Sequence, residues 1–263
     1  MGSATRESLG AAAAALAAQG VVDFATGEQL LSAALVVDGS APLRAALTDD
    51  TAALADRHSV VAAVFHGYTS AARAVIESLS SGRWSSEDDF VEALEELGIR
   101  ALAASAPKSV SVDDELFSFS TVVASSADLE LALGSRLGLA EPKVALVSRL
   151  LSSKASPQTL AILSALVAHP RGRRIDELVR YAATIVAEES GQKIATVTVA
   201  TALTASQSER LASALSAQYD SSIRINQVVD PSIIGGMRVQ IGDEVIDGSI
   251  ANRIADLRLR LAS

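Results

Sequence analysis

The sequence has no cysteine, which excludes disulfides, thiolate metal sites and cysteine nucleophiles. Aromatic residues supply only 3% of its 263 residues, although 49% of the composition is hydrophobic. Any core must therefore be built mainly from Leu, Ile, Val and Ala, which favours helices packed closely on helices. The three histidines, His58, His66 and His169, show no H-E-x-x-H spacing, and we interpret them as surface or partly packed imidazoles.

Positive charge and long apolar runs are also scarce. The 22 Lys and Arg residues are outnumbered by 31 Asp and Glu, and the formal net charge of -9 repels phosphate backbones and anionic lipid surfaces. No stretch of about 18 strongly apolar residues occurs, and the alanine-rich start lacks the basic region of a signal peptide. We therefore expect a soluble cytoplasmic protein that has no nucleic-acid partner and does not cross a bilayer by itself.

From residue 6 to about residue 188 the apolar residues recur at helical spacing. Ser86 precedes a stripe that begins at Phe90, and Ser156 precedes Pro157, so both serines stand where helix N-caps are expected. This region also contains an internal repeat. The segments VVDGSAPLRAAL and VVASSADLELAL, at residues 36–47 and 122–133, align without a gap at an offset of 86 and share seven of twelve positions.

We interpret residues 28–103 and 114–188 as two copies of one module with about four helices each. Chance alignment of alanine- and leucine-rich helices is the alternative. The predicted boundaries are a first helical module over 1–105, a second over 106–190 and a C-terminal domain over 191–263.

At Gly191 the pattern changes from helical to alternating. The expected elements are strands over 195–201 and around Ile223 and Ile225, a helix between them with a capping box at Thr204 and Gln207, and a final amphipathic helix through Ile250, Ile254, Leu257 and Leu261. The predicted fold class is therefore mostly α: an N-terminal helical bundle with a duplicated helical module, followed by a small C-terminal α/β domain.

The stretch DPSIIGGMRVQIGDEVIDGSI, residues 230–250, is the strongest candidate for a ligand-binding loop. It lacks the lysine and hydroxyl of a phosphate loop, and Gly235 and Gly236 precede an alternating strand rather than a helix. Its last acidic residues do not have EF-hand spacing, and Gly242 followed by Asp243 is typical of a hairpin turn. Asp247 to Ser249 is predicted to end a strand and to cap the last helix.

Other residues with potential chemistry have simpler interpretations. No G-x-S-x-G pattern occurs. We interpret Trp84 as a packing anchor between helices, and Arg171, Arg173 and Arg174 as a solvated loop, with an acidic partner as the alternative. The sequence thus predicts no catalytic, cofactor-binding or metal-binding residue, and no cofactor.

The segment DPSIIGGMRVQIGDEVIDGSIANRIADL, from Asp230 onward, resembles the C-terminal fingerprint of the delta subunit (OSCP) family of F-type ATP synthases. Residues 141–179 resemble the later helices of that family's N-terminal bundle, so the likeness covers about residues 114–263. The first helical copy departs from the family's usual length and resembles the long actinobacterial form. Such chains are sometimes fused to a membrane-anchored b segment. We therefore expect either a separate b-type polypeptide or a b segment removed from the start of this chain.

The resemblance implies a non-catalytic stator subunit in the peripheral stalk of a proton-translocating ATP synthase complex, and so a role in ATP synthesis and hydrogen ion transport. It implies two partners, the N-terminal segments of the alpha subunits in the catalytic head and the b-type stalk subunit. Peripheral association with the cytoplasmic face of the cell membrane would then come only through the complex. Two alternatives remain open: a generic helical adaptor, and an enzyme that uses the glycine-rich tail to bind a phosphorylated ligand.

Overall fold

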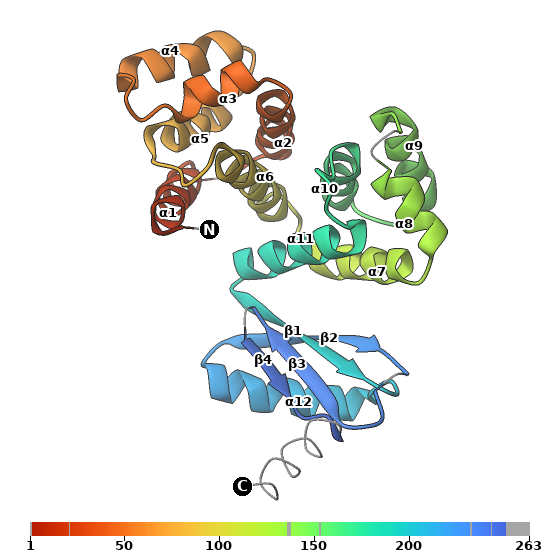
Figure 1. Cartoon of the computed structure of the whole chain (residues 1–263). Helices are drawn as coiled ribbons and strands as arrows, with labels where there is room; N and C mark the ends of the chain where they lie inside the picture. Colours follow the sequence, from red (N-terminus) through yellow and green to blue (C-terminus); the bar gives the residue numbers. More distant parts are fainter. Residues whose placement is uncertain are drawn as a thin grey trace, which may run out of the picture. The chain divides into compact units, whose positions relative to one another are not determined.

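The computed structural model describes residues 2–250, apart from residues 21, 136–137, 153, 232 and 243. The chain forms two compact units, Met1–Val186 and Ala187–Ser263. The structure is 64% helical and has a small four-stranded mixed sheet near the C-terminus (Figure 1). The predicted fold class, mostly α with a small C-terminal α/β domain, is confirmed.

The described residues of the first unit form helices joined by short turns, as Figure 1 shows. These helices are α1 (Ser3–Ala17), α2 (Phe24–Asp38), α3 (Ala41–Thr48), α4 (Leu54–Val64), α5 (Ser70–Ser81), α6 (Glu87–Ala104), α7 (Val112–Ala124), α8 (Ala127–Gly134), α9 (Ala140–Leu151), α10 (Pro157–Ala168) and α11 (Ile175–Glu189), the last of which continues into the second unit. Ser86 and Ser156 accept from the backbone amides of Asp89 and Thr159, so both predicted N-caps are confirmed.

The helices α2 to α6 are matched in order by α7 to α11. Their lengths are 15, 8, 11, 12 and 18 residues in the first set and 13, 8, 12, 12 and 15 in the second. The first two helices of each set meet at the same angle, 109°. Each copy therefore has five helices rather than about four. The additional helices are the short α3 and α8, each of which follows the 109° bend after a longer helix.

Buried polar residues repeat as well. Arg57 and Lys143, 86 positions apart, are both 6% exposed, and each donates to a backbone carbonyl, of Ser80 and of Ser135 respectively. A carbonyl oxygen near a helix C-terminus is a favourable partner for a cation. Both charges therefore have a structural explanation within their own copy.

Helix α6 belongs to both copies. Its residues Phe90, Leu94 and Leu97 lie in a core cluster with the apolar residues of α1, α2, α4 and α5. Ile99 is fully buried outside that cluster, and α6 also contacts α10. Helices α5 and α10 begin 87 positions apart, at residues 70 and 157. The same offset aligns α1 with residues 90–104, which lie in α6. Helix α6 thus occupies the place in the second copy that α1 occupies in the first.

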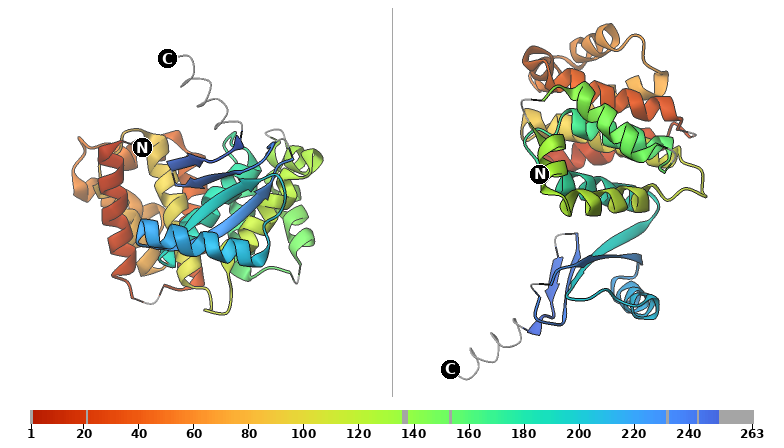
Figure 2. Two further views of the ribbon diagram at one scale, coloured as in Figure 1. Left: turned by 90° about the horizontal axis from the view of Figure 1, so that it is seen from below. Right: turned by 90° about the vertical axis from the view of Figure 1, so that its right-hand side faces the viewer.

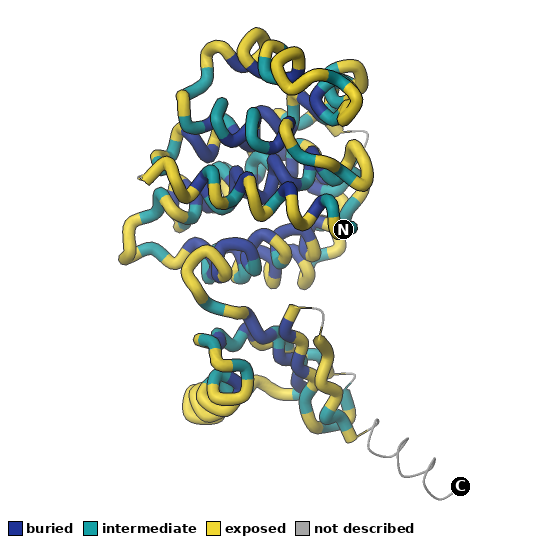
Figure 3. Tube along the Cα trace, turned by 90° about the vertical axis from the view of Figure 1, so that its left-hand side faces the viewer, coloured by how far each residue is buried: buried dark blue, intermediate teal, exposed yellow. Residues whose placement is uncertain are grey.

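The buried positions form stripes along each helix, and exposed positions follow the opposite faces (Figure 3). Within the described residues, no single helix is both long enough and apolar enough to cross a membrane. The pairs α2 with α3 and α7 with α8 reach the required length and composition only jointly, across their bends.

The second unit is a sheet with a helix against one face (Figure 2). Its elements are β1 (Gln192–Val199), α12 (Ala205–Tyr219), β2 (Ser222–Val229), β3 (Met237–Ile241) and β4 (Glu244–Asp247), with the strand order β2-β1-β3-β4. β1 pairs parallel with β2 and antiparallel with β3, which pairs antiparallel with β4. Val197 and Val199 are buried against Leu215 of α12, and the capping box of Thr204 and Gln207 is present as predicted.

The glycine-rich stretch contains β3, β4 and the turns around them, as predicted for its described residues. Gly236 has a φ of +83°, and a Cβ there would lie 2.5 Å from the carbonyl oxygen of Gly248, so only glycine fits. Gly242, with a φ of +57°, turns the chain between β3 and β4. Ser249 donates its amide to Asp247 at 2.9 Å, which closes the turn after β4. Asp243 and the predicted final helix through Ile254, Leu257 and Leu261 lie outside the described residues.

Candidate partner-binding site

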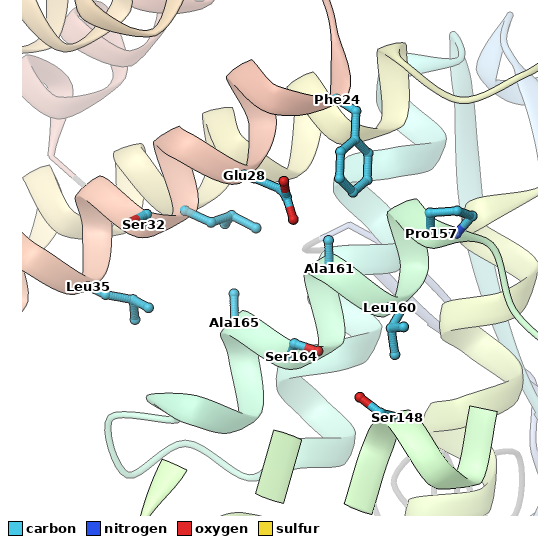
Figure 4. A pocket seen from close by; sticks show the side chains of 11 residues that line it. Phe24, Glu28, Ser32, Leu35, Ser148, Pro157, Leu160, Ala161, Ser164 and Ala165 are labelled. Atoms are coloured by element: carbon cyan, nitrogen blue, oxygen red, sulfur yellow. The ribbon is translucent and has the colours of Figure 1, made fainter. Parts of the chain in front are cut away.

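A groove of about 390 Å³ lies between α2 of the first copy and α9 and α10 of the second. Figure 4 shows the side chains that line it, with Phe24 and Glu28 on the α2 side and Ala161 and Ala165 on the α10 side. The remaining lining residues are Leu31, Ser32, Leu35, Ser148, Pro157, Leu160 and Ser164.

The groove is apolar with hydroxyl groups at its edges. Among its described lining residues, Glu28 is the one charged side chain, and its carboxylate projects between the two helices (Figure 4). Leu31 is buried, whereas Leu35, Leu160 and Ala161 are half-buried. Small and aliphatic side chains on two neighbouring helices form the kind of surface that receives the apolar face of another helix. The lining offers no pair of titratable groups for acid–base chemistry.

Ion pairs join α6, which packs on α2, to the loop that follows α10. Glu95 of α6 accepts from Arg173 at 2.8 Å and from Arg171 at 3.1 Å. Arg174 pairs instead with Asp176 at 3.1 Å. The prediction of a solvated arginine loop was therefore wrong for Arg171 and Arg173, whose side chains are only 17% and 28% exposed. Their acidic partner lies in the same chain.

A second contact joins α6 to α11. The Tyr181 hydroxyl donates to Glu96 at 3.2 Å, and Glu96 also accepts from Arg100 at 2.8 Å. Burial raises the pKa of Tyr181 far above its ordinary value, and the neighbouring carboxylate of Glu96 raises it further. The phenol therefore stays protonated and remains a hydrogen-bond donor.

The turn before the fourth helix of each copy is fixed in the same way. Gln29 accepts from the amide of Thr69 at 2.7 Å, and Glu115, at the equivalent place, accepts from the amide of Ser156 at 2.9 Å. Glu115 also accepts from the Ser156 hydroxyl at 2.7 Å. These bonds position α10, and hence one wall of the groove.

Trp84 and the three histidines, also considered as candidates from the sequence, take no part in the groove. Trp84 donates to the carbonyl of Leu79 at 3.0 Å and meets Phe90 edge-on at 5.4 Å, which confirms it as a packing anchor. His66 and His169 are exposed and His58 is half-buried, as predicted. Among the described residues, no group of three His, Asp or Glu side chains is placed to hold a metal ion.

The fold defines a class of protein: a largely helical protein built from a repeated module, with a small α/β domain near its C-terminus. Residues 99–261 match the family described as ATP synthase delta (OSCP) subunit. ATP synthase subunit delta of Leifsonia xyli subsp. xyli is 49% identical over 263 residues, which is 100% of both chains. The subunit delta of Kineococcus radiotolerans is 39% identical over 251 residues, 94% of this chain and 91% of the relative.

The chain belongs to the ATP synthase delta (OSCP) subunit family. It is a component of the peripheral stalk of the membrane-bound ATP synthase complex. A chain of the Toxoplasma gondii mitochondrial ATP synthase hexamer, 19% identical, covers 65% of this chain and 98% of its own length with a TM-score of 0.42, which adds no argument to this assignment. The family match begins inside α6, so the first copy lies outside it, whereas the full-length relative includes that copy.

Proposed function

We propose that this chain is the non-catalytic stator subunit that links the N-terminal segments of the alpha subunits to the b-type stalk and resists the torque of the rotor. Family membership carries the proposal. In this role the chain lies at the cytoplasmic face of the cell membrane and is held there only through the complex. Neither the groove in Figure 4 nor the turns of the second unit need a titrating side chain for such a role.

The helical unit supplies the surface for the alpha segments. An amphipathic helix laid into the groove between α2 and α10 would bury its apolar face on both copies at once. The small α/β domain, residues 191–263, joins the b-type subunit. We keep the division into helical modules over 1–105 and 106–190, with α6 as the helix that the two share.

Affinity purification from solubilised membranes tests this assignment. A tag on this chain is expected to recover the alpha and b-type subunits together with ATPase activity. The Ala161→Glu variant adds a charge to the groove and is expected to recover at least tenfold less alpha subunit, with the amount of b-type subunit unchanged. Ala145→Glu, at an exposed position of α9, is the control and is expected to leave the recovery of both subunits unchanged. Recovery of the chain alone, without ATPase activity, would refute the proposed linkage.

A further inference from the structure

A second groove, of about 470 Å³, lies in the second copy between α7 and the end of α9. Its described lining residues are Asp114, Glu115, Ser118, Phe119, Val122, Leu150, Leu151, Lys154 and Ala155. Val122 is 55% exposed and Leu150 is 41% exposed, so the groove presents apolar side chains to solvent. Ala155 stands directly before Ser156, the N-cap of α10.

The first copy shows what fills this place. There the residue directly before the N-cap Thr69 is Tyr68. Its ring lies 5.1 Å from the ring of Phe65, centroid to centroid, and its hydroxyl donates to Ser32 of α2 at 3.0 Å. The side chain therefore bridges the turn between α4 and α5 to the face of α2.

The second copy keeps the surroundings but has lost the aromatic ring. Ser118 stands 86 positions after Ser32, and Ala155, counted from the cap, takes the place of Tyr68. The neighbouring valine is correspondingly more open, because Val122 is 55% exposed and its counterpart Val36 is 42% exposed. Phe119, which replaces Ala33, forms a buried floor beneath this opening.

We propose that the groove between α7 and α9 binds an aromatic side chain of a neighbouring polypeptide in the assembly. The ring would pack on Phe119, Val122 and Leu151 and, if it is a tyrosine, would donate to Ser118 as Tyr68 donates to Ser32. A buried ring gives large contact area for little lost side-chain freedom, which suits a single anchoring residue. The inference requires membership of the complex but not the proposed contacts with alpha or b.

Photo-crosslinking in the assembled synthase tests this site. With p-benzoylphenylalanine at position 150, irradiation is expected to attach this chain to a Tyr- or Phe-containing segment of another subunit. Ala155→Tyr supplies the ring from within the chain, as Tyr68 does, and should reduce the adduct at least tenfold, whereas Ala155→Ser should not. Val122→Asp, which charges the rim, should reduce it as well.

The absence of an adduct, an adduct with a second copy of this chain, an adduct with a segment that lacks aromatic residues, or a yield that Ala155→Tyr leaves unchanged would each overturn the inference. Recovery of the chain with the other subunits is measured on the same samples, so failure of this site is distinguished from failure of the proposed linkage. In the free chain, 4-methylphenol should shift the amide resonances of Ser118 and Ala155. Tyr68→Ala should create a second such site around Ser32, and Ala155→Tyr should abolish the first.

Discussion

Removal of residues 28–103 is expected to unfold the second helical copy, although nearly all of that copy remains in the chain. The deletion takes away α6 and with it the contact with α10, the fully buried Ile99, and Glu95, which pairs with Arg171 and Arg173. A buried aliphatic side chain such as Ile99 contributes about 1.5–3 kcal/mol, and the loss of the Glu95 pairs costs about 2–3 kcal/mol because solvent reaches part of both arginines. Together these losses reach the lower end of the stability of a typical domain, about 5–15 kcal/mol.

The matched control removes residues 1–83 and keeps α6 with its N-cap Ser86. This variant exposes the face of α6 that packed on the first copy, but it retains the contact of α6 with α10, the pairs of Glu95 with Arg171 and Arg173, and the hydrogen bond from Tyr181 to Glu96. Thermal unfolding followed by circular dichroism should show a cooperative transition for the control and none for the helices of the variant that lacks residues 28–103. Equal cooperativity in the two variants would show that α6 is not shared between the copies.

Glu95→Ala is expected to lower the free energy of unfolding by about 2–3 kcal/mol. The carboxylate is 9% exposed and neutralises two guanidinium groups that are themselves largely covered. Breaking a fully buried pair costs about 3–5 kcal/mol, and we expect less here because solvent reaches part of both arginines. Urea denaturation of the full chain measures the difference.

Glu87→Ala is the matched control, since Glu87 lies on the same helix and pairs with Arg44 at 3.0 Å but has a side chain that is 48% exposed. An exposed pair contributes about 0–1 kcal/mol and is screened by salt. The two substitutions should therefore differ clearly in urea midpoint, and only the Glu87 effect should vanish in high salt. Equal losses would mean that Glu95 does not anchor the arginine loop.

Local signals in the sequence were sufficient for much of the fold. The side chains of Ser86, Ser156 and Thr204 each accept a hydrogen bond from the backbone amide three residues later. The local sequence pattern that predicts these N-caps therefore contains both partners of the bond. The repeat was visible for a similar reason, because an offset of 86 preserves buried positions such as Leu47 and Leu133. The glycine turns followed from conformational freedom that other residues lack.

The groove and its supports depended on contacts that no local pattern reveals. Glu95 meets Arg171 and Arg173 across 76 and 78 positions, and either side alone reads as an ordinary exposed charge. The sharing of α6 was hidden because one helix has to satisfy two cores at once. The contrast between Tyr68 and Ala155 becomes visible only when the copies are aligned at their N-caps, since α9 is one residue longer than α4 and shifts the offset from 86 to 87.

The central claim, that this chain transmits force without taking part in chemistry, is tested most directly by depleting it from membranes that carry the synthase and then restoring it. We predict that ATP synthesis driven by a proton gradient is lost on depletion and recovers when the full chain is added back. ATP hydrolysis by the catalytic head should continue at its original rate per head throughout. A loss of hydrolysis that the added chain restores in proportion would contradict the account, because it would place this chain in the catalytic step.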